Sequence, residues 1–175
     1  SGGLHLDGLA DTADGIFSHR PREQILEIMK DSRIGVMGVL ALLFCILLKI
    51  AGVAGIIQSE KLIWLILAPT LGRTALVIGL VFISHIPSEK TLAEQFYQRG
   101  EYFLLLFCPL PFAIIFYMNW VFALVSMFIF TLLLIGLLLF FKSKLGGITG
   151  DTLGAKTEII ETLFLLVGGM SALII

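Results

Sequence analysis

Residues 34–57 read IGVMGVLALLFCILLKIAGVAGII, and Lys49 is the single charged side chain in this run. A helix that crosses a bilayer needs about 20 consecutive apolar residues, because each residue advances the helix by about 1.5 Å and the hydrocarbon core is about 30 Å thick. This run is long enough to cross. We therefore predict that residues 34–57 form a membrane-spanning helix.

Four further apolar segments follow, at residues 62–84, 102–118, 120–141 and 159–175. Asn119 alone separates two of them, which predicts a tight helical hairpin, and Pro109 and Pro111 predict a kink just before it. A re-entrant loop is the alternative for residues 102–118. We expect an all-α, polytopic integral membrane protein with about five transmembrane helices and short cytoplasmic amphipathic helices.

The overall composition supports this fold class. The chain is 58% hydrophobic and 14% charged, with a mean hydropathy of +1.01, which is more apolar surface than a soluble domain of this size can cover. The net charge of −1 does not indicate a nucleic-acid partner. Cys45 and Cys108 lie in apolar segments, so we expect buried thiols rather than a disulfide.

Lysine and arginine gather in alternate connections between the segments. If all five segments span, residues 1–33, 85–101 and 142–158 share one side, and Lys61 lies on the other. The shared side then holds nine cations, namely Arg20, Arg22, Lys30, Arg33, Lys90, Arg99, Lys142, Lys144 and Lys156. Cation-rich loops face the cytoplasm, so we predict a cytoplasmic side that carries both polar motifs described next. The bias would weaken if residues 102–118 did not span.

The first motif is GGLHLDGLADTADG, residues 2–15. Asp7, Asp11 and Asp14 are spaced so that one helical face carries all three. Like charges in one stripe repel each other, and a hard cation such as Mg²⁺ prefers carboxylate oxygens, so these residues are predicted metal ligands. The alternative is a solvated acidic face. His5, one turn earlier, is a candidate base, a candidate ligand or simply a polar residue.

The second motif is KLGGITGDTLGAKTEIIE, residues 144–161. Glycine-rich backbone that leads into a helix N-terminus can bind an anion through free N–H groups. The candidate phosphate-binding residues are Gly146, Gly147, Thr149, Gly150 and Thr152, with Glu161 near the same helical face as the acidic residues. Asp151 and Glu158 are seven residues apart and are candidate metal ligands. The alternative is an interhelical loop with a capping Asp or Thr.

Three cations are further candidates. Lys30 and Arg33 lie one turn apart before the first span and could bind a phosphate or anchor the chain at the membrane surface. Arg73 lies within an apolar segment, where a charge is costly and is usually paired. We expect its partner to be an aspartate of the first motif or a substrate phosphate. Lys49 lies nearer the end of its segment and could extend toward the membrane surface, so it is not among the candidates.

These motifs together resemble the cobalamin synthase family, adenosylcobinamide-GDP ribazoletransferase. The matching stretches are residues 2–15, 22–35, 72–73 and 145–161. The resemblance implies a single membrane-embedded transferase domain over residues 1–175, with an acidic cytoplasmic region at 1–33 and a cytoplasmic glycine-rich loop at 142–158. The family is usually longer at its N-terminus, so a truncated chain is expected.

The resemblance also implies a reaction. The enzyme would join adenosylcobinamide-GDP to α-ribazole or its 5′-phosphate, release GMP and form adenosylcobalamin or its 5′-phosphate. It would be a Mg²⁺-dependent, multi-pass protein of the cell inner membrane with its active site facing the cytoplasm. In that chemistry, Asp7, Asp11, Asp14, Asp151 and Glu158 would hold Mg²⁺, and Arg73, Lys30 and Arg33 would neutralise phosphate charge. A carboxylate, such as Asp11, or His5 would take the proton from the attacking hydroxyl.

Two other readings stay open. Membrane transferases of the CDP-alcohol phosphotransferase or prenyltransferase kind also use Asp-rich helices and Mg²⁺, although the complete CDP-alcohol signature is absent here. An ion-coupled transporter would place its ionisable residues near the bilayer midplane, whereas these carboxylates cluster at predicted helix ends. The sequence does not indicate an oligomeric state.

Overall fold

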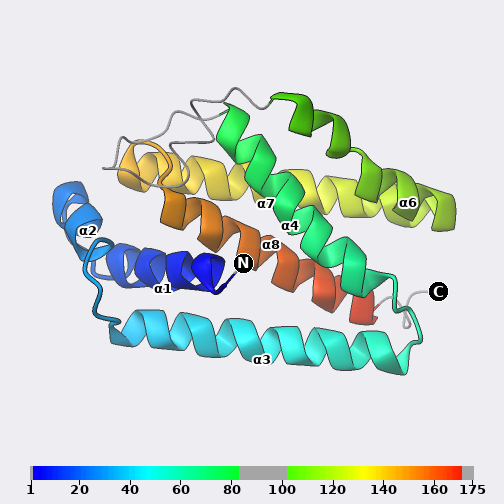
Figure 1. The fold of residues 1–175 in the computed structure, drawn as a ribbon, viewed down its shortest axis with the longest axis horizontal. Coiled ribbons are helices and arrows are strands. Elements are labelled where there is room, and N and C mark those ends of the chain that lie inside the picture. Colours follow the sequence, from blue (N-terminus) through cyan, green and yellow to red (C-terminus); the bar gives the residue numbers. More distant parts are fainter. Residues whose placement is uncertain (1, 83–101, 171–175) are drawn as a thin grey trace.

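The computed structural model describes residues 2–82 and 102–170, and the regular elements within them are helices (Figure 1). They are α1 (Leu4–Ile16), α2 (Arg22–Ile28), α3 (Val36–Gln58), α4 (Trp64–Phe82), the 3-10 helix η1 (Tyr102–Phe107), α6 (Leu110–Met118), α7 (Trp120–Leu145) and α8 (Gly150–Met170). Lys90 and Arg99, which belong to the predicted cytoplasmic set, lie outside the described residues.

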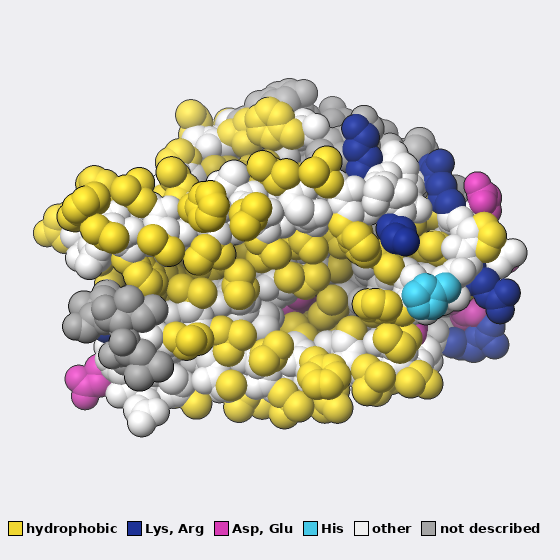
Figure 2. All heavy atoms as spheres, turned by 180° about the vertical axis from the view of Figure 1, so that it is seen from behind, with side chains coloured by type: hydrophobic (Ala, Val, Ile, Leu, Met, Phe, Trp, Pro, Cys, Tyr) yellow, Lys and Arg dark blue, Asp and Glu magenta, His cyan; other side chains and the backbone are white. Residues whose placement is uncertain are grey.

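Three helices, α3, α4 and α7, are long and apolar enough to cross a membrane, and Phe103–Met118 forms a shorter apolar helical stretch. Large apolar side chains such as Phe44 and Leu47 of α3 and Phe128 of α7 are exposed. Figure 2 shows hydrophobic side chains over most of one face and most of the visible cations toward one end. Because hydrocarbon does not penalise exposed apolar groups as water does, these observations confirm the all-α, polytopic membrane class.

Helix α8 lies at the centre of the molecule and packs against α4, α3 and α1 (Figure 1). Small residues permit close contact between the backbones: a Cβ on Gly52 of α3 would lie 2.8 Å from the carbonyl carbon of Leu165, and one on Gly72 of α4 would lie 3.0 Å from the carbonyl oxygen of Thr157. Small residues at helix contacts are typical of membrane proteins. The central position of α8 brings polar residues of three neighbouring helices to one place.

Helix α8 begins earlier than the sequence predicts. Residues 150–158 are its first turns, and residues 142–145 still belong to α7, so the connecting loop is 146–149 rather than 142–158. Thr149 and Thr152 explain the start, because each side-chain oxygen accepts a hydrogen bond from the other residue's backbone N–H, at 3.2 and 2.8 Å. As a consequence Lys156, expected in a cytoplasmic loop, is a buried residue of α8.

Residues 17–21 separate α1 from α2. The predicted hairpin after residue 118 is confirmed. The hairpin forms at Asn119, whose side chain accepts a hydrogen bond from the N–H of Phe122 at 2.9 Å and so caps α7. Whether residues 102–118 cross the membrane or re-enter it stays a prediction.

Two of the three predicted cytoplasmic segments, those that lie within the described residues, meet at one end of the bundle. Ile25 and Met29 of the α2 region pack with Leu145 at the end of α7, whereas the connection from α3 to α4, which contains Lys61, lies at the opposite end (Figure 1). This arrangement agrees with the cation distribution, since residues 20–33 and 142–144 share an end.

Candidate functional site

The two acidic motifs meet where α1 crosses α8. A Cβ on Gly8 would lie 2.7 Å from the backbone oxygen of Asp151, and a Cβ on Gly154 would lie 3.1 Å from the Cα of His5. Because no side chain separates the helices at these two points, their backbones touch. This contact brings the first aspartates of α1 to the N-terminus of α8.

A cavity of about 420 Å³ opens beside this crossing. Asp7 and Asp11 line it. The remaining lining residues come from the start of the chain and α1, and from α3 and the segment before it, namely Gly2, Gly3, Leu4, Ala10, Ser32, Ile34 and Leu42. Asp7 is exposed and Asp11 is partly buried. The cavity is therefore an accessible space with two carboxylates in its wall.

The carboxylates influence one another. Burial, followed by the charges of Asp7, Asp151 and Asp14, raises the pKa of Asp11 to about 6. Burial also raises the pKa of Asp151, with a smaller contribution from the charge of Asp7, while the backbone N–H of Asp151 opposes the shift. A divalent cation would relieve such repulsion, since it favours the ionised form of each carboxylate.

The predicted metal ligands do not all remain available. Asp14 accepts hydrogen bonds from the backbone N–H groups of Gly35 at 2.7 Å and Gly38 at 2.8 Å, and so holds the N-terminus of α3. Glu158 pairs with Lys49. No three His, Cys, Asp or Glu side chains gather closely enough to enclose an ion in the part of the chain that is described.

Asp7, Asp11 and Asp151 nevertheless fit the chemistry of Mg²⁺. This ion is commonly held by one or two carboxylates and completes its shell with water and substrate phosphates. Two aspartates in a cavity wall, with a third across the helix contact, match that mode better than they match a closed protein cage.

His5 points toward α8. Its Nδ1 lies 3.9 Å from Oε1 of Glu158, beyond hydrogen-bond distance, and this buried nitrogen has no hydrogen-bond partner among the described residues. Burial and then the charge of Arg73 lower the pKa of His5, so its neutral form is favoured. The neutral imidazole can accept a proton.

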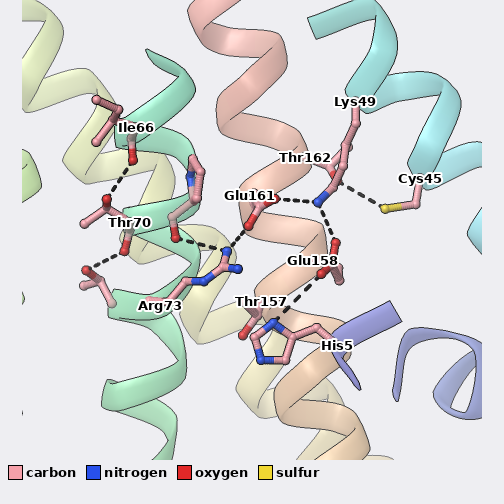
Figure 3. A network of polar contacts seen from close by, with 12 residues as sticks. His5, Cys45, Lys49, Ile66, Thr70, Arg73, Thr157, Glu158, Glu161 and Thr162 are labelled. Carbon is pink, nitrogen blue, oxygen red and sulfur yellow. Dashed lines mark hydrogen bonds and ion pairs between the residues drawn. The ribbon is translucent and has the colours of Figure 1, made fainter. Parts of the chain in front are cut away.

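Further along α8, four charged side chains form a network (Figure 3). Nζ of Lys49 lies 2.6 Å from Oε2 of Glu158 and 2.6 Å from Oε1 of Glu161. Nη1 of Arg73 pairs with Oε2 of Glu161 and also donates to the carbonyl oxygen of Pro69 at 3.3 Å. The network joins α3, α8 and α4.

Two charged residues in this region have protein partners that the sequence did not predict. The partner of Arg73 is Glu161 rather than an aspartate of the first motif, because α8 packs directly on α4 and turns Glu161 toward it. Lys49 does not extend to the membrane surface, since its ammonium group turns inward to two glutamates. The sequence feature that could have predicted these pairs is Glu158 and Glu161, which lie one turn apart. Two carboxylates this close on a mostly buried helix require a cation nearby.

The glycine-rich loop is mostly buried. Thr149 and Thr152 are 5% and 1% exposed, and their hydroxyl groups take part in the cap of α8. Gly147 is buried, Gly150 is partly buried, and Gly146 ends α7 with a left-handed φ of 78°. A Cβ on Gly146 would lie 2.9 Å from Cζ of Arg22, a cation that the sequence analysis did not select. In this structure the loop shapes the start of α8.

Lys30 and Arg33 are exposed beside the cavity. The guanidinium group of Arg33 donates to both oxygens of Asp31, at 3.0 and 3.1 Å from Nε and 2.6 Å from Nη2. These bonds lower the pKa of Asp31 to about 2. Arg33 thus lies in sequence between Ser32 and Ile34, which line the cavity together with Asp7 and Asp11, and Lys30 precedes them along the same segment.

Lys156 is a further charged group that the sequence analysis did not select. It is 1% exposed, its Nζ has no hydrogen-bond partner among the described residues, and it lies directly against Gly79 of α4. It does not belong to the network around Lys49.

Comparison with known proteins connects these observations to a family. A family model described as cobalamin-5-phosphate synthase matches residues 1–169. Proteins named adenosylcobinamide-GDP ribazoletransferase are similar to the chain: one from Alkaliphilus metalliredigens is 40% identical, covering 95% of this chain and 66% of that protein. One from Desulforamulus reducens is 41% identical, covering 97% of this chain and 69% of that protein. One from Clostridium novyi is 36% identical, covering 95% of this chain and 67% of that protein. The chain thus spans about two thirds of the length of these relatives. No solved structure matches it significantly.

Proposed function

Because this chain belongs to the cobalamin-5-phosphate synthase family, we propose that it transfers the adenosylcobinamide phosphate group from adenosylcobinamide-GDP to α-ribazole or its 5′-phosphate. GMP leaves, and the product is adenosylcobalamin or its 5′-phosphate. The observation that carries this proposal is the contact of α1 with α8, which brings Asp7 and Asp11 of the cavity wall near enough to Asp151 for these charges to raise the pKa of Asp11 and of Asp151. Transfer of a phosphate group from a diphosphate to a hydroxyl needs charge neutralisation and alignment, and Mg²⁺ held by these aspartates would supply both.

The three aspartates would hold Mg²⁺, which neutralises phosphate oxygens and stabilises the leaving phosphate when it is bound. Asp14 and Glu158, the other predicted ligands, would act indirectly, since Asp14 holds α3 against α1 and Glu158 holds Lys49. The protein residues would thus divide into those that face the cation and those that keep α1, α3 and α8 together.

Cationic side chains would bind the phosphates of the donor. Both contacts that Arg73 makes within the described residues use Nη1, so Nη2 and Nε–H remain for a phosphate oxygen. Lys30 and Arg33 would act at the mouth of the cavity, and the start of α8 would add backbone N–H groups. His5 or a carboxylate would take the proton from the attacking hydroxyl.

The site would face the cytoplasm from a multi-pass protein of the inner membrane. Cations at the end where α2 meets α7 support this orientation, because positive loops remain on the cytoplasmic side. Both substrates would then reach the site from the cytoplasm.

GMP release by the full-length protein in detergent tests the proposal. We expect release from adenosylcobinamide-GDP and α-ribazole in the presence of Mg²⁺ and its loss with a chelator. Asp11→Asn and Asp151→Asn should each lower the rate by about 100-fold or more, since even residues that only support a metal ligand typically contribute 10- to 100-fold. Glu23→Gln, on the exposed side of α2, is the control and should retain the wild-type rate.

Near-normal, Mg²⁺-dependent GMP release by both aspartate variants would contradict the metal assignment. Release of CMP from a CDP-alcohol, or of pyrophosphate from a prenyl diphosphate, with no GMP release from adenosylcobinamide-GDP, would place the protein among the other membrane transferases.

A further inference from the structure

Glu158 and Glu161 are an unusual pair for the interior of a membrane protein. They lie three residues apart on α8, so they share a helical face, and their side chains are only 5% and 12% exposed. Two ionised carboxylates in this position repel each other and lose hydration. A cation must lie close to both for the pair to persist in the ionised form.

Lys49 is that cation. Its ammonium group is 2.6 Å from one oxygen of each glutamate, and its side chain is 21% exposed. Gly52, one turn further along α3, lies against the backbone of Leu165. The close approach of α3 and α8 at this glycine brings Lys49 within reach of both carboxylates.

The second oxygen of each glutamate faces another candidate residue (Figure 3). Oε2 of Glu161 pairs with Nη1 of Arg73, whose side chain is 45% exposed. Oε1 of Glu158 is directed at Nδ1 of His5 across 3.9 Å. Each carboxylate therefore has one oxygen at Lys49 and the other toward a residue proposed to act on the substrates.

We infer that Lys49 is a positioning residue for the transfer reaction, an inference that rests on the function proposed above. By holding Oε1 of Glu161, Lys49 directs Oε2 to Arg73, and the guanidinium group is then fixed with Nη2 and Nε–H available to a donor phosphate. With Lys49 present, two carboxylates face two cations. Without it, Arg73 alone serves two carboxylates, and its orientation toward the phosphate is lost.

A double-mutant cycle tests this inference through donor binding. The dissociation constant of adenosylcobinamide-GDP is measured by calorimetry for the full-length protein in detergent with Mg²⁺ and without acceptor. We expect Lys49→Met and Arg73→Met each to weaken binding by about tenfold or more, and the double variant to bind no more weakly than Arg73→Met alone, because contacting residues couple. Lys49→Arg, which keeps the charge, should restore most of the affinity.

Lys142→Met is the matched control, since this lysine is exposed at the end of α7 and should bind the donor as the wild type does. The melting temperature of each variant shows that it is folded, and Lys49→Gln replaces Lys49→Met if the latter does not fold. Wild-type affinity in Lys49→Met, or in Lys49→Gln if that is the variant that folds, would overturn the inference. So would a double variant whose loss of affinity equals the product of the two single losses. Either result would leave the proposed function intact. A wild-type protein that neither binds the donor nor releases GMP would instead reject the proposed function itself, and this role of Lys49 with it.

Discussion

Asp11 lies where burial and like charges act together. Its pKa rises from 3.8 to about 6 because of burial and the charges of Asp7, Asp151 and Asp14. Since the folded pKa lies above the unfolded value, the native state holds this proton more tightly than the unfolded state. The contribution of Asp11 to stability therefore becomes less favourable as the pH rises from about 4 to about 6, and the cost is fully present above that range.

A bound cation should offset this cost only where Asp11 is ionised. We expect Mg²⁺ to raise the melting temperature at pH 7.5 and to have a much smaller effect at pH 5, where the proton competes with the metal. At a concentration 100 times its dissociation constant, a ligand stabilises by about 2.7 kcal/mol. Melting curves with Mg²⁺ or a chelator at both pH values measure the effect, and Asp11→Asn is the control that should reduce it. Equal Mg²⁺ shifts at both pH values would contradict this assignment.

At the scale of the helices, the site depends on the contact between α1 and α8. Gly8 and Gly154 allow the two backbones to touch, and the contact brings Asp11 toward Asp151. The helical spacing of the aspartates is readable from the sequence because it follows from 3.6 residues per turn. Which helix the stripe meets is not readable, since it depends on the packing of segments more than 130 residues apart.

Gly8→Ala should disturb this contact. The new Cβ would lie 2.7 Å from a backbone oxygen that cannot move aside independently of its helix, so overpacking should cost about 1–3 kcal/mol. This cost should exceed the gain of about 1 kcal/mol that alanine brings to a helix. We expect a lower melting temperature together with reduced Mg²⁺-dependent GMP release.

Gly136→Ala in α7 is the matched control, because its Cβ would meet nothing within 4 Å. It should preserve both the melting temperature and GMP release. If Gly8→Ala also preserved the melting temperature and GMP release, the backbones of α1 and α8 would not be in contact at Gly8.

At the scale of the whole molecule, the connections between the helices lie at two opposite ends of the bundle. The α2 region and the connection from α7 to α8 lie at one end, and the connection from α3 to α4 lies at the other (Figure 1). Since α3, α4 and α7 are each long and apolar enough to cross a bilayer, we predict that Lys142 and Lys61 lie on opposite sides of the membrane.

Cysteine labelling in intact cells can test this topology. In a background with Cys45→Ala and Cys108→Ala, a membrane-impermeant thiol reagent should label Lys61→Cys from outside and should label Lys142→Cys only after the membrane is opened. The physical reason is the cation bias, which retains the Lys142 end in the cytoplasm. Labelling of both positions from the same side would contradict the five-span arrangement.

The features that the sequence determined by itself are those set by local physics. Apolar length predicts the spanning helices, Asn119 marks the hairpin, and the spacing of the aspartates places them on one helical face. Each depends on a few neighbouring residues, so no knowledge of packing is needed. The same motifs also support membership of the family that matches residues 1–169.

Only the tertiary structure decided which charges meet. Lys49 and Glu161 are 112 residues apart, and Arg73 and Glu161 are 88 apart. Asp14, expected to face a metal, instead holds the start of α3. Charge pairing depends on distance in space and on exclusion of water, and glycine contacts that place α8 against α1, α3 and α4 set both. The acidic stripes can therefore be predicted from the sequence. Packing alone decides that some aspartates remain available for a cation while the glutamates pair with Lys49 and Arg73.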